Sequence, residues 1–213
     1  MKIVKTNLSL LLLIFCMGGH INAQPFNDEL KQDYDLFNSS TAANKEAAVV
    51  KLEQMAASYP RQWAANYYAA YADAAISTNL SVGGKRDIYL DKADRYLKEV
   101  IALNETPDET YVLAAYVAYA RFLVDPSGRW KKYMPVINEN LEKAKQLNPA
   151  NPRIYYLQGI PVFHKPKLFG GGKDKARPYF EKARELFAKQ DHSSILKPYW
   201  GERENAGFLT KCN

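Results

Sequence analysis

Four stretches of this chain share one spacing of small and large apolar residues, with polar residues between them. Two copies have identical offsets of four, seven and twelve residues: Ala48, Leu52, Met55 and Pro60 in one, and Ile137, Leu141, Ala144 and Pro149 in the other. The other two copies are Ala93, Leu97 and Val100, and Ala176, Phe180 and Ala183. Offsets of three and four place residues on one helical face. The pattern therefore predicts four helices, each pressed closely against a neighbour.

A second pattern precedes these helices. The sequence from Tyr68 to Tyr71 (YAAY) returns as LAAY from Leu113 and more loosely as LQGI from Leu157. A repeated pair of helices is a stacking unit, so the chain is predicted to be an α-solenoid. The expected helices span residues 27–39, 42–59, 62–77, 86–104, 108–124, 133–148, 152–164 and 174–190. Prolines and glycines between them mark the turns, and Pro161 is expected to kink or end its helix early.

These motifs resemble the tetratricopeptide repeat (TPR), which combines a large residue and a small pair on its first helix with A-x3-F-x2-A-x4-P on its second. The second helices recur here every 45, 44 and 39 residues, against 34 in that family, so the extra residues fall between the helices of each pair. The resemblance implies a divergent member with about four TPR-like helix pairs at residues 24–190. Residues 191–213 are expected to form a C-terminal cap or tail that covers the last pair.

The N-terminus has the features of a signal peptide. Lys2 and Lys5 precede an apolar run of about ten residues, which is shorter than the ~20 residues that span a bilayer. Ile21, Asn22 and Ala23 fit a cleavage site, so residues 1–23 are expected to be removed and the protein to be exported, periplasmic or secreted. Two alternatives remain: a buried N-terminal helix, and a lipid anchor on Cys16, although Phe15 is bulky for that processing. No later segment is apolar enough to be transmembrane.

Charge gives little reason to expect nucleic acid as a partner. The full chain has a net charge of +6, and loss of residues 1–23 leaves 27 basic and 23 acidic side chains. Cys212 is then the one remaining cysteine, which excludes an internal disulfide. It is either a free thiol or one that pairs between chains.

Catalytic and metal-binding patterns are nearly absent, so we expect no enzyme, no cofactor and no metal site. The three histidines have no ligand-like spacing, and one cysteine cannot build a structural zinc site. The run from Gly170 to Lys173 is similar to a phosphate-binding loop, but Asp174 replaces the required Ser or Thr and no strand precedes it. A flexible turn between two helices explains it more simply.

The TPR resemblance implies a partner-binding groove along the first helices of the pairs. Carried over by the repeat alignment, the groove residues are Tyr67, Tyr71, Tyr116, Tyr119, Tyr156 and Phe163. Tyrosine combines a broad apolar face with a polar tip and few rotors, which suits a binding surface. The alternative is that several of these rings are core packing.

A second candidate surface is the edge formed by the inserted loops, since solenoid geometry places equivalent insertions on one side. It contains Lys85, Arg86, Arg129, Trp130, Lys131, Lys132, Lys167 and Lys173. Basic residues beside exposed aromatic rings suit peripheral contact with an anionic surface. The alternative is that these cations complement the dipoles of helix C-termini.

Together these features predict a non-catalytic protein–protein interaction scaffold of the bacterial cell envelope, with a protein or peptide partner. The alternative is an accessory solute-handling subunit of a periplasmic uptake system, because the glycine-rich turn before Phe180 is similar to turns in such components. A hydrolase with a helical fold is a remote third class.

Overall fold

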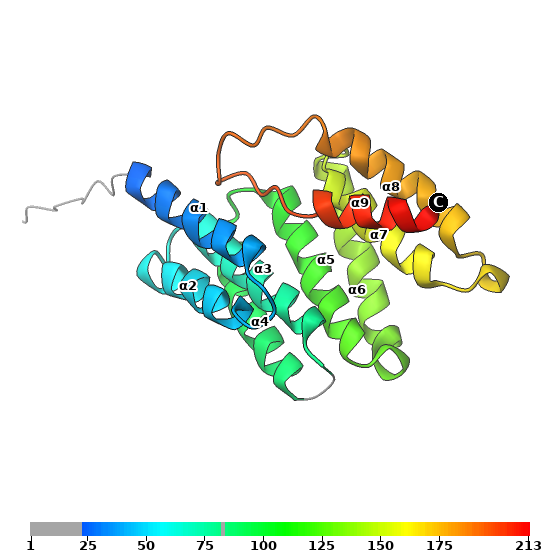
Figure 1. Ribbon diagram of the computed structural model, residues 1–213, viewed down its shortest axis with the longest axis horizontal. Helices are drawn as coiled ribbons and strands as arrows, with labels where there is room; N and C mark the ends of the chain where they lie inside the picture. Colours follow the sequence, from blue (N-terminus) through cyan, green and yellow to red (C-terminus); the bar gives the residue numbers. More distant parts are fainter. Residues whose placement is uncertain (1–22, 82–83) are drawn as a thin grey trace, which may run out of the picture.

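The computed structural model describes residues 23–81 and 84–213, which form nine α-helices, one short 3₁₀ helix and no strand (Figure 1). The elements are α1 Ala23–Ser39, α2 Lys45–Ser58, α3 Trp63–Asn79, α4 Lys85–Leu103, α5 Pro107–Val124, α6 Pro126–Leu147, α7 Pro152–His164, η1 Lys167–Phe169, α8 Lys173–Phe187 and α9 Glu202–Cys212. The all-α class predicted from the sequence is confirmed for these residues.

Each helix packs against its neighbours in the chain, and α3 also packs against α5, as α5 does against α7. Helix α3 lies at the centre, and its residues from Trp63 to Ser77 are all buried. The small residues of the repeated patterns, among them Ala70, Ala115, Ala144 and Ala183, are fully buried. They allow close helix approach, as their offsets predict. The finer description as a TPR-like solenoid stays a prediction.

The largest difference from the expected helix boundaries is at the start of α6. Helix α6 begins at Pro126 and not near residue 133, because the Asp125 carboxylate caps it by accepting a hydrogen bond from the Gly128 N–H at 3.0 Å. Arg129, Lys131 and Lys132 therefore lie on the first turns of this helix and not in a loop. Helix α7 has the predicted bounds and continues past Pro161 to His164, so of the two effects expected at Pro161 the early end does not occur.

Residues 191–201 run back from α8 toward α1 and α3 before α9 begins (Figure 1, orange to red). The Tyr68 hydroxyl donates to the Ile195 carbonyl at 3.0 Å, and the rings of Tyr34 and Tyr199 lie edge to face at 5.3 Å. Helix α9 then packs along α8, with Cys212 buried. The C-terminal residues thus join both ends of the helical array. Their separate capping role stays a prediction.

The proposed cleavage site and the rest of the predicted signal peptide fall in residues 1–22, outside the described part of the chain, except for Ala23 at the start of α1. No helix in the described part is both long and apolar enough to cross a bilayer.

Candidate functional site: a tyrosine-lined cavity

A cavity of about 840 Å³ opens along the helices that come first in each predicted pair. Its walls are formed by the end of α1 and the following loop, by α3, α5 and α7, and by α9. We call it the tyrosine cavity; its aromatic lining residues are Phe37, Tyr71, Tyr116, Tyr119, Tyr156 and Phe208. Small-molecule sites commonly measure about 300–1,000 Å³ and combine apolar walls with a few polar groups. The cavity has the size and character of such a site.

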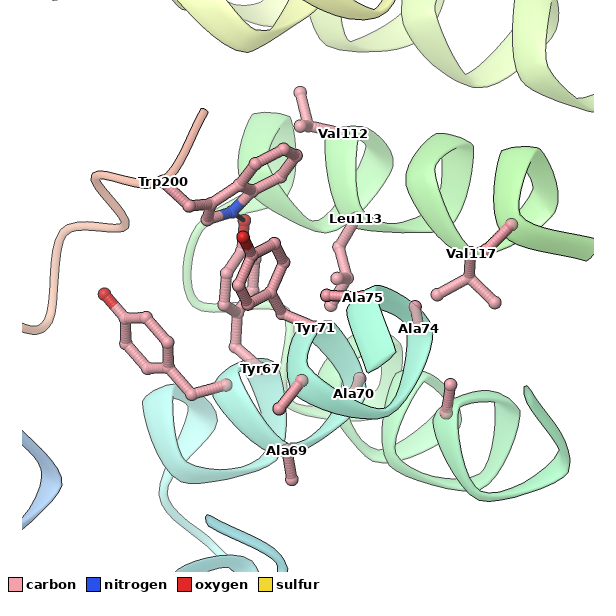
Figure 2. Close-up of a cluster of buried hydrophobic side chains, with 14 of the residues drawn as sticks. Tyr67, Ala69, Ala70, Tyr71, Ala74, Ala75, Val112, Leu113, Val117 and Trp200 are labelled. Atoms are coloured by element: carbon pink, nitrogen blue, oxygen red, sulfur yellow. Dashed lines mark hydrogen bonds between the residues drawn. The ribbon is translucent and has the colours of Figure 1, made fainter. Parts of the chain in front are cut away.

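Three packed rings form what we call the aromatic wall. Tyr71 of α3 and Tyr116 of α5 line the cavity, and Trp200 packs against both without lining it. The ring centroid of Tyr71 lies 5.5 Å from that of Tyr116 and 4.8 Å from that of Trp200, and Trp200 lies 4.9 Å from Tyr116. Figure 2 shows the indole of Trp200 above Tyr71, reaching in from the segment before α9. Because these rings pack against one another, they lose little conformational entropy when a flat ligand stacks on them.

A buried polar network fixes Trp200 in this position. Its indole N–H donates to the Tyr67 hydroxyl at 2.8 Å, and that hydroxyl donates to Glu109 Oε2 at 2.9 Å (Figure 2 shows the first bond). Arg153, which is 1% exposed, is bound to Glu109 and donates to the Trp200 carbonyl at 3.3 Å. Tyr67 is therefore fully buried beneath the wall and does not line the cavity, in contrast to the sequence-based groove.

Of the other predicted groove residues, four line the cavity and one does not. Tyr71, Tyr116, Tyr119 and Tyr156 line the cavity together. Phe163 instead packs at 5.2 Å against Phe208, whose ring reaches the cavity. Burial raises the pKa of the cavity tyrosines, that of Tyr119 to about 12. Their side chains are therefore neutral phenols at physiological pH.

The rim of the cavity carries two cations, Lys45 and Arg203, and two carboxylates, Glu46 and Glu204. The Lys45 ammonium lies 4.0 Å above the Phe37 ring and donates to the Phe37 carbonyl, while Arg203 of α9 is exposed and pairs with its neighbour Glu204 at 3.1 Å. Burial lowers the pKa of Lys45, and the positive charge of Arg203 lowers it further. An anionic group bound between Lys45 and Arg203 would offset this repulsion.

Phe37, Lys45, Trp200, Arg203 and Phe208 were not among the sequence-based groove residues. Phe37 and Lys45 lie on α1 and at the start of α2, at positions that the groove alignment of first helices does not include. Trp200, Arg203 and Phe208 belong to the C-terminal segment, which lies outside the repeats. Its aromatic and charged residues were the available signal, and they predicted a cap instead.

A smaller hollow of about 220 Å³ adjoins the cavity and shares Tyr71 and Arg203 with it. His192 lines this hollow and stacks on Tyr199 at 5.4 Å.

The basic edge predicted from the sequence is only partly a free surface. Arg86 is buried and donates to the carbonyls of Ser77 and Leu123, so it binds the C-terminal ends of α3 and α5. Arg129 makes two 2.8 Å bonds to Asp87. Lys85 pairs with the half-buried Glu46 of α2. The remaining members, Trp130, Lys131, Lys132, Lys167 and Lys173, are exposed.

A comparison of the chain with protein-family models finds no match, and neither does a comparison with curated protein sequences. The structure is similar to that of the HusA haemophore from Porphyromonas gingivalis, with a TM-score of 0.75 and 30% sequence identity over 92% of this chain and 94% of the other. The chain belongs to the HusA family. The HusA structure supports the all-α fold, since the match covers 92% of this chain.

Proposed function

We propose that this member of the HusA family is an exported, non-catalytic binding protein for haem or a closely related porphyrin, held in the tyrosine cavity. The observation that carries the proposal is the cavity itself, which is lined by several aromatic rings and has Lys45 and Arg203 at its rim, beside Glu46 and Glu204. The family relationship to a haemophore supports the ligand class. Of the roles predicted from the sequence, solute handling fits this site best.

The lining suits the macrocycle and its carboxylates. Tyr71, Tyr116 and Tyr119 offer flat faces for stacking, and Lys45 and Arg203 offer partners for carboxylates. Among the described residues that line the cavity, none is a histidine, cysteine or methionine, the side chains that most often hold haem iron. A tyrosine ligand would have to ionise, which burial opposes. We therefore expect affinity to come mainly from ring contacts and ion pairs.

Tyr119→Ala should weaken haemin binding about tenfold, because truncation of an aromatic anchor in a binding site commonly costs 1–2 kcal/mol. Tyr119 packs less against other rings than Tyr71 or Tyr116, so the fold should persist. The measurement is an absorbance titration with haemin, using the chain from Gln24.

Tyr111→Ala is the matched control for this variant, since Tyr111 lies on the same helix outside the cavity. Tyr119→Phe should bind normally if the ring face matters and the hydroxyl does not. Normal binding by Tyr119→Ala, together with loss of binding when Arg129, Lys131 and Lys132 are neutralised, would move the site to the basic edge.

Lys45→Met and Arg203→Met should each weaken haemin binding about tenfold, because a hydrogen bond to a charged group contributes roughly 1.5 kcal/mol. Neither change should alter the affinity for the dimethyl ester of protoporphyrin, which has no free carboxylates. Lys51→Met, an exposed lysine on the same helix as Lys45, is the control. If these variants lost the same affinity for haemin and for the dimethyl ester, carboxylate pairing would be refuted, whereas ring stacking would remain possible.

The protein-interaction scaffold predicted from the sequence is the second candidate function. The cavity runs across α1, α3, α5 and α7, which would also suit an extended peptide segment, as the TPR resemblance implies. The test is a competition experiment in which haemin is added to the protein with a captured envelope partner. If saturating haemin leaves the partner bound, the two ligands have separate sites; if it displaces the partner, they share the cavity.

A further inference from the structure

The loop between α7 and α8 holds two bulky apolar side chains in water. Leu168 is 88% exposed and Phe169 is 65% exposed, the highest values among the large apolar residues of the described chain. Both belong to η1, and neither lines the tyrosine cavity. Isolated apolar residues on a surface are common, but two adjacent ones at the tip of a loop are unusual enough to suggest a partner.

This loop is a firmly hydrogen-bonded structure. The Gly172 N–H donates to the Val162 carbonyl at 2.8 Å, and the Gly171 N–H donates to the Pro166 carbonyl at 3.2 Å. Gly170 and Gly172 have φ values of 80° and 99°, which a residue with a side chain rarely adopts. The backbone therefore presents Leu168 and Phe169 outward in a fixed arrangement.

The apolar tip is surrounded by positive charge. Lys165, Lys167, Lys173 and Lys175 are exposed around it, and they are opposed within this segment by Asp174, which pairs with Lys167 at 3.2 Å. Lys165 and Lys167 follow the C-terminus of α7, where the helix dipole favours cations. Lys173 and Lys175 lie in the first turn of α8, where the dipole disfavours them. Favourable interaction with helix dipoles therefore does not explain all four of these lysines.

Exposed apolar and basic side chains are also found together at the start of α6. A hollow of about 290 Å³ is bordered by both Lys165 and Met134, and Met134 lies one helical turn beyond Trp130. Trp130 is 51% exposed and is followed by the exposed Lys131 and Lys132. In Figure 1 the start of α6 and the α7–α8 loop both lie toward the right-hand side of the molecule.

We propose that this loop docks on an anionic lipid surface, with Leu168 and Phe169 entering the headgroup region and the surrounding lysines pairing with lipid phosphates. Apolar side chains gain free energy in the interface, and each lysine near an anionic membrane adds to the attraction. A lipid surface is favoured over a protein partner because the tip is small and its charge is almost of one sign. A stable protein interface needs a broad complementary area, typically above ~1,000 Å². The inference does not depend on the ligand of the tyrosine cavity.

Vesicle sedimentation tests this directly, with the chain from Gln24, which contains the whole buried core described above and lacks the apolar leader. Wild type should bind vesicles of mixed phosphatidylglycerol and phosphatidylcholine, and bind vesicles of phosphatidylcholine alone much more weakly. Leu168→Ser with Phe169→Ser should reduce binding to the mixed vesicles at least about tenfold. Lys165→Gln with Lys173→Gln should reduce it about fivefold for each lysine removed, and added salt should weaken it.

Ile101→Ser with Leu147→Ser is the matched control, since both residues are exposed apolar side chains away from the loop. This variant should bind like wild type, and circular dichroism should show that every variant is folded. Equal binding of wild type to both kinds of vesicle, or undiminished binding by the loop variants, would overturn the proposal. So would binding to a membrane preparation that is lost after protease treatment of its proteins, because the partner would then be a protein.

Discussion

Replacing Glu109 with alanine should lower the free energy of unfolding by about 3–5 kcal/mol, the usual cost of leaving a buried charge without its partner. Glu109 accepts hydrogen bonds from Arg153, from Asn151 at 2.7 Å and from Tyr67 at 2.9 Å. Its loss strands the Arg153 guanidinium in the core and removes the acceptor that orients Tyr67. Urea unfolding followed by circular dichroism measures the change.

Glu109→Ala should also loosen the aromatic wall, because Tyr67 and Arg153 both bind Trp200. Quenching of tryptophan fluorescence by an added solute should increase. Combining Glu109→Gln with Arg153→Met removes both charges, and this double variant should recover much of the stability lost by Glu109→Ala. Glu139→Gln, which breaks an exposed pair with Lys143, is the control and should change stability little. A loss below about 1 kcal/mol in Glu109→Ala would show that the network does not stabilise the fold.

Replacing Asp73 with asparagine should raise the free energy of unfolding by about 2–4 kcal/mol at pH 7. Asp73 is 0% exposed within α3, and neither carboxylate oxygen has a hydrogen-bond donor. Burial and the nearby Glu53 raise the pKa of Asp73 to about 9 from an ordinary value of 3.8. The folded chain therefore keeps a proton on Asp73 that the unfolded chain releases, and asparagine supplies a neutral side chain without that cost.

The pH dependence of this effect has a definite sign. Between about pH 4 and pH 9 the folded state binds more protons than the unfolded state at Asp73. This residue therefore makes wild type less stable as the pH rises, by up to about 1.4 kcal/mol per pH unit. Denaturant unfolding across this range should show a gap between Asp73→Asn and wild type that widens with pH. Asp28→Asn, at an exposed position on α1, should show no such gap. A constant gap would mean that Asp73 is ionised in the folded state.

Much of the fold follows from local patterns in the sequence. The small-residue offsets place Ala144 and Ala183 at close helix contacts, and most helix ends fall within a few residues of the expected positions. The main boundary error, at α6, arose because the glycine of the sequence Pro126-Ser127-Gly128 was interpreted as a turn signal. With Asp125 before it, the same sequence begins a helix whose first N–H groups are capped.

The candidate site was predictable only where it follows the repeat. Tyr71, Tyr116, Tyr119 and Tyr156 occupy equivalent positions on successive first helices, so one alignment groups all four. Phe208 reaches the cavity, and Trp200 packs against its tyrosines, because residues 191–201 turn back across the helices. The tertiary contacts that direct this return have no periodic signal in the sequence. Tyr67 shows the converse limit, since the repeat alignment placed it in the groove, whereas it is as fully buried as its neighbour Tyr68.

The return of the C-terminal segment also sets the order in which the protein acquires its binding site. The hydrogen bond between Trp200 and Tyr67 joins residues 133 positions apart, and closing so long a loop is among the slower steps of folding. During synthesis, α3 and α5 emerge well before Trp200, so their tyrosines first exist without the indole that completes the wall. A nascent or partly folded chain therefore lacks the finished site, and ligand capture becomes available only to molecules whose last helix has docked.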